Sequence, residues 1–365
     1  MTQSEDLLQK LANIADGSPL AEARHLREAA ATHTQGSYDV LFSRAEPDDF
    51  PLSLRLDLAQ KIAHWHGEES LADHYAGLAT SGLQEERISA AWVHAERLVF
   101  KPAGATPKHL RDLEQSGWSP EAIVTLAQLV AFVSFQSRLL RGYRLLNGEN
   151  GPASSDRPVT AAAWHTEPQT LGGKKAPPVF TRENLGWEPW LAAKPLAEFN
   201  PEEKTALAKF GHTDSDYFRL LARNLPLLEQ RTLTDKGIFF SADGLPRKER
   251  ELAATVASKV NGCIFCASVH ARKAAQLSKQ TDDIQRLLDT APGEPLAVDQ
   301  SPRWLALIEF AASLSATPPT ANTQQLTVLR EQGLSELELV DLIQSTAFFA
   351  WANRLMLTLG EPYIP

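Results

Sequence analysis

The chain has 365 residues, of which 43% are hydrophobic and 22% are charged, and its formal net charge at pH 7 is −9. This composition is typical of a folded globular protein, and the length favours two domains over one. The acidic residues are scattered and no dense run of Lys and Arg occurs, which argues against nucleic acid or an anionic membrane as a partner.

The N-terminal residues MTQSEDLLQKLANIADGSP lack the basic stretch and apolar stretch that mark a secretory signal. The long apolar run Ala122–Phe135 is interrupted by Thr, Gln and Ser and is shorter than a membrane span requires. We therefore expect a cytoplasmic protein with no membrane partner. Structural disulfides are uncommon in that compartment, so the two cysteines of the chain favour catalysis or metal binding over a structural bridge.

Helix-start signals recur in order along the chain. They lie at Ser119–Pro120, Asn200–Glu203, Ser301–Pro302 and Ser335–Glu338. Serine followed by proline is typical of an N-cap and the first helical residue, and Ser335 and Glu338 have capping-box spacing. Few segments alternate apolar and polar residues with a period of two, so we predict an all-α fold.

The chain also contains an internal repeat. Gly117–Leu140 and Gly333–Met356 align without a gap and are identical at nine of 24 positions. Chance would give roughly one or two identities, so the sequence indicates a duplication. Further upstream, Leu54–His74 aligns with Lys248–His270 if a gap of two residues is allowed.

This upstream alignment indicates what the first copy lacks. It places Asp57 opposite Glu251, His74 opposite His270, and Gly67 and Ser70 opposite Cys263 and Cys266. The first copy is therefore predicted to keep the scaffold without the thiols. Arg138 and Arg354 match between the copies, and we interpret both as residues that support the fold.

Three segments are predicted along the chain. Residues 1–148 form a cysteine-free domain, and residues 201–365 form a domain that holds both cysteines. The segment between them, 149–200, begins with a stretch rich in Gly, Pro, Ser and Thr, which predicts a linker and irregular structure.

The stretch Val260–His270, VNGCIFCASVH, holds every cysteine of the chain. If a helix runs from about Gly262 to Gln276, then Cys263, Cys266 and His270 share one face of it. A helix N-terminus favours a thiolate, and a nearby imidazole can accept the thiol proton. The arrangement suits attack on an O–O or S–S bond followed by disulfide closure.

The residues alone leave the order of attack open. The helix dipole favours Cys263, because it lies nearer the helix end, whereas proximity to His270 favours Cys266.

Other readings of these residues compete. A zinc site needs four ligands, and the cluster supplies two cysteines and one histidine, with no local fourth ligand. Two inert buried cysteines are also possible. Glu251 could pair on the surface with Arg247 or Lys248. His64 and His66 lack acids or cysteines at ligand spacing, so we interpret them as surface and core histidines.

The run Glu251–His270 resembles the signature of the alkylhydroperoxidase D / carboxymuconolactone decarboxylase superfamily. That signature has a glutamate, a twelve-residue step to C-x-x-C, and a histidine after three further residues. The segment Phe180–Ala192, FTRENLGWEPWLA, and the sequence behind it resemble the peroxidase-related branch. The resemblance covers Val179–Pro365, and the first repeat resembles a degenerate copy.

The resemblance implies an enzyme, a thiol-dependent hydroperoxidase built from two tandem helical domains and needing no haem, metal or other cofactor. By this analogy Cys266 attacks the peroxide, Cys263 is the resolving thiol, His270 is the base, and Glu251 orients it or relays a proton through water. A thiol or dithiol would supply the electrons. The resemblance also implies an oligomer, and a homotrimer of this two-copy chain would mimic a hexamer of single-copy relatives.

One position departs from the family pattern. The best-known members carry a histidine directly before the second cysteine, whereas this chain has Phe265. Two alternatives therefore stand beside the hydroperoxidase. One is a thiol–disulfide oxidoreductase or redox sensor without peroxide turnover, and the other is a cysteine-independent lyase like the decarboxylases. The decarboxylase branch works without this cysteine pair, which argues against the lyase.

Overall fold

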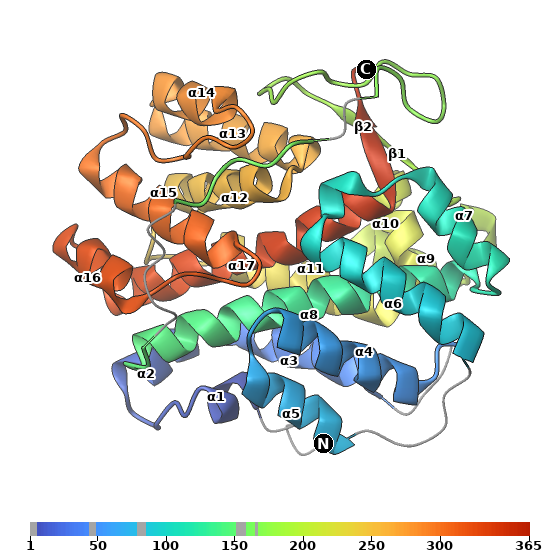
Figure 1. Ribbon diagram of the computed structural model, residues 1–365, viewed down its shortest axis with the longest axis horizontal. Coiled ribbons are helices and arrows are strands. Elements are labelled where there is room, and N and C mark those ends of the chain that lie inside the picture. The colour runs from blue at the N-terminus through green and yellow to red at the C-terminus, as the bar shows by residue number, and fades with distance from the viewer. Residues whose placement is uncertain (1–5, 44–48, 79–84, 151–157, 165–166) are drawn as a thin grey trace.

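Helices make up most of the computed structural model, which describes residues 6–43, 49–78, 85–150, 158–164 and 167–365 (Figure 1). The described residues contain one small sheet, in which β1 (Gly186–Pro189) pairs antiparallel with β2 (Gly360–Tyr363). The predicted all-α fold class is confirmed.

The helices fall into two series along the chain. The first series comprises α1 (Leu7–Leu11), α2 (Pro19–His25), α3 (Glu28–Leu41), α4 (Leu52–Trp65), α5 (Glu69–Leu78), α6 (Glu85–Phe100), η1 (Pro102–Gly104), α7 (Pro107–Gln115) and α8 (Pro120–Leu146). The second comprises η2 (Leu196–Glu198), α9 (Pro201–Lys209), α10 (Asp216–Leu221), η3 (Ala222–Asn224), α11 (Leu225–Phe239), α12 (Arg247–Asn261), α13 (Ile264–Ser278), α14 (Thr281–Asp289), α15 (Pro302–Ser315), α16 (Thr323–Glu331) and α17 (Glu336–Thr358).

The predicted helix starts are confirmed by their caps. The Ser119 hydroxyl accepts a hydrogen bond from a backbone N–H in the first turn of α8, and Ser301 does the same for α15. Asn200 and Ser335 each form a reciprocal capping box with the glutamate three residues later. These caps satisfy backbone N–H groups that have no partner inside the helix.

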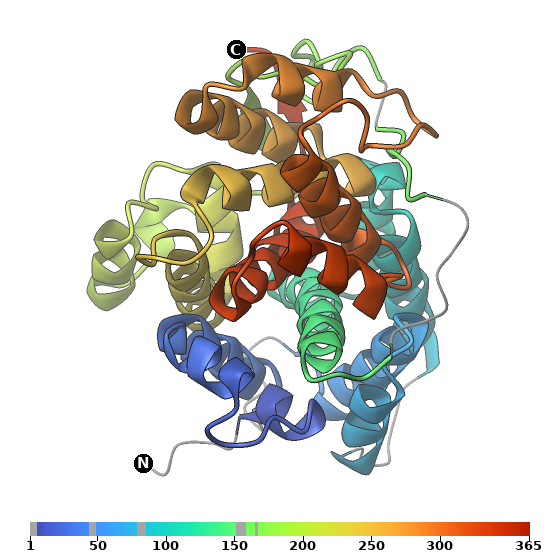
Figure 2. The same ribbon diagram turned by 90° about the vertical axis from the view of Figure 1, so that its left-hand side faces the viewer.

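The order of helices in the first series recurs in the second. The equivalent pairs are α3 and α11, α4 and α12, α5 and α13, α6 and α15, α7 and α16, and α8 and α17. Two of these pairs pack directly on each other, α8 on α17 and α3 on α11. Contact between equivalent elements is the arrangement of a two-fold dimer. The two series therefore pack like the halves of an internal dimer, with α8 and α17 side by side at the centre (Figures 1 and 2).

Two buried arginines tie these halves together in a reciprocal way. The Arg138 guanidinium of α8 donates to the Ser315 carbonyl at the end of α15, at 3.0 Å. The Arg354 guanidinium of α17 donates to the Val99 carbonyl near the end of α6, also at 3.0 Å. Val99 and Ser315 are equivalent in the same gapless alignment that pairs the two arginines. The interpretation of Arg138 and Arg354 as fold-supporting residues is confirmed.

A second pair of arginines fixes the register of the upstream repeat. The Arg55 Nε donates to the Phe50 carbonyl, and the Arg250 Nε donates to the Leu245 carbonyl, each at 2.7 Å. A single alignment without a gap makes both donors and both acceptors equivalent. The same alignment matches the glycines with positive φ that follow α4 and α12, Gly67 and Gly262.

The predicted two-residue gap in this segment is therefore wrong. Without the gap, Leu56, Glu68, Leu71 and Tyr75 stand opposite Glu251, Cys263, Cys266 and His270. The gapped alignment pairs residues of the same type, an acid with an acid and a histidine with a histidine. In the structure, the arginine contacts and the helix ends determine the register instead.

The central helix α8 also corrects an expectation. It has 27 residues and a mean hydropathy of 1.5 over its most apolar window, so by length and composition alone it could cross a membrane. That window is completely buried inside the fold, where α8 packs against α17, α4 and α6. Its apolar composition is accounted for by its place in the core.

Irregular chain before the second helix series crosses the junction of α12 and α13. The Ala162 N–H donates to the Lys259 carbonyl at 3.0 Å, and the Trp164 ring packs edge-on against Phe180 at 5.0 Å. Parts of the predicted linker, residues 151–157 and 165–166, lie outside the described residues. The described part holds Ala163 against Gly262, so this glycine is closely surrounded.

We predict that Gly262→Ala destabilises the protein more than Gly67→Ala. Both glycines have a left-handed backbone, which costs a non-glycine residue roughly 1 kcal/mol. A Cβ at Gly262 would also lie 2.6 Å from the Ala163 carbonyl oxygen, whereas the nearest atoms at Gly67 are 3.9 Å away. Overpacking should add roughly 1–3 kcal/mol to the loss of unfolding free energy at Gly262. Urea unfolding followed by circular dichroism measures both, and equal losses would contradict the prediction.

Candidate active site

The junction between α12 and α13 places the two cysteines. Gly262, with φ of 76°, ends α12 in a left-handed conformation, and Cys263 is the N-cap residue of α13. The predicted helix therefore begins two residues later than expected, so Cys263 precedes its first turn and Cys266 lies within that turn. Both cysteines are free thiols and are buried, with exposed fractions of 1% for Cys263 and 5% for Cys266.

His270 and Glu251 form a short hydrogen bond beside the thiols. His270 lies one helical turn beyond Cys266 on α13, and its Nδ1 is 2.5 Å from a carboxylate oxygen of Glu251 on α12. The other carboxylate oxygen of Glu251 is 2.5 Å from the Arg247 guanidinium. Glu251 does pair with Arg247, as the surface reading expected, but its side chain is only 1% exposed. The structure thus brings all four predicted site residues together.

The surroundings separate the pKa values of the two thiols. Burial disfavours the thiolate of Cys266, but the hydrogen bond from Cys263, the charge of His270, a hydrogen bond from Asn353 and the charge of Arg231 outweigh it and lower the pKa. Burial and the neighbouring Cys266 raise the pKa of Cys263 well above that of a free thiol. The thiolate form is therefore favoured at Cys266 and the thiol form at Cys263.

The pKa values of Glu251 and His270 shift in the directions expected for an ion pair. Burial disfavours the imidazolium, but the hydrogen bond and charge of Glu251, with the charge of Cys266, raise the pKa of His270. Burial likewise opposes ionisation of Glu251, but His270 and Arg247 lower the pKa of its carboxyl. The three pKa shifts therefore favour the carboxylate of Glu251, the imidazolium of His270 and the thiolate of Cys266, and a thiolate is the nucleophilic form of the sulfur.

The sequence reasoning missed two polar residues at this site. Asn353 of α17 is a hydrogen-bond partner of both thiols, and it is also bonded to Asn261 and Ser258 at 3.0 Å each. Asp235 of α11 lies within electrostatic range of His270 and Arg247, and burial raises the pKa of its carboxyl. The repeat held a signal for Asn353, because the gapless alignment of α8 with α17 places it opposite a serine.

The first copy has a different set of side chains in these places. Glu68, opposite Cys263, is buried and lies 2.8 Å from both Arg141 and Arg144. Burial raises the pKa of Glu68 to about 7. Tyr75, opposite His270, donates a hydrogen bond to Gln136 at 2.5 Å. In the corrected alignment the first copy still has no cysteine opposite Cys263 or Cys266, as predicted.

The interpretation of the two histidines near this region is confirmed. His66 is fully buried, with its Nε2 2.9 Å from the Ser134 hydroxyl. The side chain of His64 is 57% exposed and pairs with Glu69. Among the residues that the structure describes, no group of three or more His, Cys, Asp and Glu side chains is arranged to hold a metal ion.

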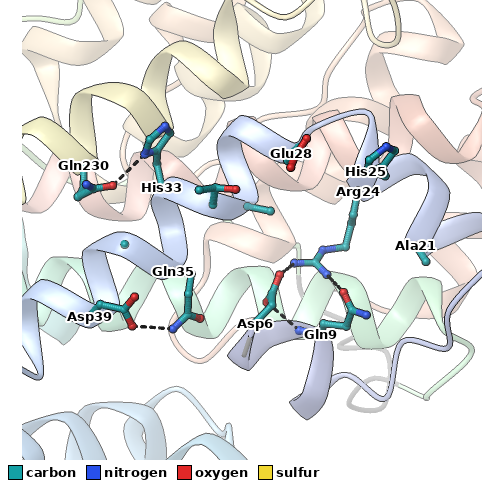
Figure 3. A pocket seen from close by; sticks show the side chains of 13 residues that line it. Asp6, Gln9, Ala21, Arg24, His25, Glu28, His33, Gln35, Asp39 and Gln230 are labelled. Carbon is teal, nitrogen blue, oxygen red and sulfur yellow. Dashed lines mark hydrogen bonds and ion pairs between the residues drawn. The ribbon is translucent and has the colours of Figure 1, made fainter. Parts of the chain in front are cut away.

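A large cavity of about 540 Å³ lies elsewhere, between α1, α2, α3 and Gln230 of α11 (Figure 3). Its polar groups bond to one another. The Arg24 guanidinium lies 2.7 Å from Asp6, and the His33 Nδ1 lies 2.8 Å from the side-chain oxygen Oε1 of Gln230. None of the four predicted site residues lines this cavity.

A much smaller apolar cavity of about 30 Å³ borders Cys263. Trp164, Ala176 and Pro177 from the irregular segment form one side of it, and Phe265 is also in its lining. The irregular segment therefore lies over Cys263 on this side.

Comparisons with known proteins place part of the chain in a family. Residues 226–292, which include Glu251, both cysteines and His270, match the carboxymuconolactone decarboxylase family. This match confirms the resemblance to the superfamily for that segment. A comparison with curated proteins found no match.

Two solved structures are similar to about half of the chain. One is an uncharacterized peroxidase-related protein from Ralstonia eutropha JMP134, described as an alkylhydroperoxidase AhpD core, with 21% identity and a TM-score of 0.36 over 44% of this chain and 85% of that one. The other is an uncharacterized peroxidase-related protein from Silicibacter sp. TM1040, with 21% identity and a TM-score of 0.37 over 47% of this chain and 92% of that one.

We predict that Glu251→Gln lowers the pKa of His270, because burial then acts without the opposing carboxylate charge. A group whose pKa is raised by folding adds stability below its ordinary pKa and loses that contribution as the pH rises through the folded value. Glu251→Gln should therefore lower the free energy of unfolding more at pH 6 than at pH 9. An NMR titration of the His270 ring measures the pKa directly.

The matched control for this titration is Glu249→Gln. Glu249 is also a buried glutamate of α12, but it pairs with Arg303 at 2.7 Å. Its replacement should leave the His270 titration in place. An unchanged His270 titration in Glu251→Gln would show that the carboxylate does not control the imidazole.

Proposed function

Residues 226–292 of this chain are a carboxymuconolactone decarboxylase family domain, and from that premise we propose that the protein is a thiol-dependent hydroperoxidase. Its chemistry is assigned to Cys266, Cys263, His270 and Glu251. The observation that carries the proposal is the geometry of the site, in which two buried free thiols at the start of α13 lie beside the Glu251–His270 hydrogen bond of 2.5 Å. The opposite directions of the two thiol pKa shifts agree with an attacking thiolate and a resolving thiol.

In the first step the Cys266 thiolate attacks the terminal oxygen of a hydroperoxide ROOH. The O–O bond breaks, Cys266 becomes a sulfenic acid, and the sulfur is oxidised by two electrons as the peroxide is reduced. The leaving alkoxide takes a proton from the His270 imidazolium and departs as ROH. The Glu251 carboxylate holds the imidazolium in place, since it lies 2.5 Å from Nδ1.

In the second step Cys263 attacks the sulfenic acid of Cys266. The Cys263 proton and the sulfenic hydroxyl leave as water, and a Cys263–Cys266 disulfide forms. The high pKa of Cys263 keeps it protonated during the first step, so it does not compete for the peroxide. Once Cys266 is oxidised, the thiolate charge that raises the pKa of Cys263 is gone. A dithiol then returns two electrons and two protons and becomes a disulfide itself.

The second candidate is a thiol–disulfide oxidoreductase or redox sensor without peroxide turnover. Phe265 favours it, because this residue stands where the best-known members carry a proton-relay histidine, and here it lines the apolar cavity beside Cys263. The same thiolate would then attack the disulfide of a partner protein. The cysteine-independent lyase has no comparable support from the geometry.

Location and assembly are part of the proposal. A cytoplasmic, reducing compartment would keep both cysteines as thiols between turnovers. The chain would assemble as a homotrimer, in which each two-copy chain takes the place of two subunits of a hexamer. The internal packing of α8 on α17 is compatible with this, since it already joins the two copies.

We predict that the reduced protein consumes tert-butyl hydroperoxide in the presence of excess dithiothreitol. Cys266→Ser should lower consumption to the level of the dithiol alone, because the attacking sulfur is gone. Cys263→Ser should still form a sulfenic acid at Cys266 but no internal disulfide. His270→Gln should lower the rate roughly a hundredfold through loss of the proton donor.

The surface variant His64→Gln is the matched control and should keep the wild-type rate. Disulfide exchange with a model substrate, without peroxide consumption, would favour the oxidoreductase over the hydroperoxidase. Activity that survives Cys263→Ser/Cys266→Ser would overturn both and favour the lyase.

A further inference from the structure

One buried arginine of the second copy forms no ion pair with a described residue, although its charge acts on Asp235 of the same helix. Arg231 of α11 is only 6% exposed, and its guanidinium lies over the rings of Phe348 and Trp351, at 5.1 and 5.7 Å. It takes part in no hydrogen bond or ion pair with the residues that the structure describes, and its Nε is buried without a partner. The other buried arginines differ, since Arg138 and Arg250 donate to backbone carbonyls. An unpaired buried cation is costly, so a counter-charge is expected beside it.

A buried hydroxyl in the same region also lacks a partner. Tyr217 of α10 is 7% exposed, and its hydroxyl oxygen is buried without a hydrogen bond to any described residue. Its ring packs edge-on against Trp187 at 5.3 Å. Buried tyrosine hydroxyls usually find a partner, so this donor is free for a ligand.

Ring contacts place both side chains near the site. The Phe348 ring beneath Arg231 lies 6.0 Å from Phe349, which packs edge-on against His270 at 4.4 Å. The Trp187 ring beside Tyr217 donates to the carbonyl of Met356, which lines the cavity at Cys263. The charge of Arg231 contributes to the lowered pKa of Cys266. Burial and the charges of both sulfurs raise the pKa of Tyr217 to about 12, against the opposing effect of Arg231. Arg231, Tyr217 and the sulfurs therefore lie within electrostatic range of one another.

The repeat gives independent support. The starts of α2 and α3 are as far apart in the sequence as the starts of α10 and α11, so the two pairs align without a gap. Leu20 then stands opposite Tyr217, and Thr34 stands opposite Arg231. The copy without thiols thus lacks the arginine and the tyrosine hydroxyl as well.

We propose that Arg231 is the fixed counter-charge of the Cys266 thiolate and that the Tyr217 hydroxyl donates a hydrogen bond to the departing oxygen of the hydroperoxide. This inference rests on the proposed function. As the O–O bond breaks, negative charge moves from sulfur to the departing oxygen, where a preorganised donor stabilises it. The proton that completes ROH still comes from His270, so Tyr217 keeps its own proton and positions the oxygen.

Several charged or titratable groups around Cys266 and His270 set the pH dependence of Cys266 together. Cys263 and His270 on α13, Tyr217 on α10 and Arg231 on α11 interact with Cys266 itself. Asp235 on α11 and Glu251 on α12 act on His270, and Arg247 on α12 acts on Glu251. Arg231 and Arg247 are the arginines in this set, and Arg247 is already paired with Glu251. Removing the Arg231 charge should therefore act directly on the thiolate.

The test uses the full chain with Cys263→Ser, so that Cys266 is the single thiol. Its reaction with iodoacetamide is followed against pH, and its oxidation by tert-butyl hydroperoxide is followed by mass spectrometry of the quenched protein. Arg231→Gln should slow alkylation of Cys266 at pH 7 roughly tenfold, because it moves the pH midpoint of the Cys266 reaction upward. Arg231→Lys keeps the positive charge and should restore most of the alkylation rate. Tyr217→Phe should leave the alkylation profile in place and slow oxidation roughly tenfold.

Tyr75→Phe is the matched control, because it removes a buried hydroxyl from the first copy, and both profiles should stay unchanged. Near-ultraviolet circular dichroism and thermal unfolding check that each variant is folded. An unchanged alkylation midpoint in folded Arg231→Gln, or a midpoint in folded Arg231→Lys that rises as far as in Arg231→Gln, would overturn the role of Arg231. An unchanged oxidation rate in Tyr217→Phe would overturn that of Tyr217. If the parent thiol is not oxidised at all, the proposed function fails together with the role of Tyr217, and the alkylation profile alone decides on Arg231.

Discussion

Each buried charge in this protein needs a partner. The partners of the charges that support the fold differ in kind from those of the charges at the candidate active site. Arg55 and Arg250 donate to backbone carbonyls at their own helix starts, and Arg138 and Arg354 donate across the interface between the copies. These groups are satisfied by the chain alone, so they hold helices together. Around Cys266 we propose a different arrangement, in which the thiolate itself completes the charge balance. Reactivity and burial are therefore linked, since the environment that hides this sulfur also favours its charged form.

Duplication allows this specialisation. The equivalent helices α8 and α17 bury one another, so each copy supplies half of a shared core (Figure 2). In the first copy a glutamate bound by two arginines replaces the first cysteine, and a tyrosine replaces the histidine. That copy can stabilise the second without keeping any of its chemistry. The irregular segment that crosses the α12–α13 junction lies over Cys263 of the second copy.

Much of the fold and part of the candidate site could be predicted from the sequence, because interactions between residues close in the sequence determine them. Serine–proline pairs and capping boxes fix helix starts through hydrogen bonds within four residues, and the spacing of Glu251, Cys263, Cys266 and His270 reflects two consecutive helices. The remaining site residues come from distant helices, so no spacing reveals them. Asn353, Tyr217 and Arg231 interact with the thiols only after α10, α11 and α17 have packed, and Asp235 interacts with His270 in the same way. The register of the upstream repeat was misread for a related reason, since arginine contacts across loops fix it.

The central claim is that folding stabilises the Cys266 thiolate at neutral pH and leaves Cys263 protonated. Thiolate absorbance near 240 nm, recorded against pH for the wild type and both single cysteine-to-serine variants, measures this without any substrate. The account predicts a midpoint below the value of about 8.5 for a free cysteine, present in Cys263→Ser and absent in Cys266→Ser. A midpoint at or above that value in Cys263→Ser, or an early midpoint that persists in Cys266→Ser, would contradict it.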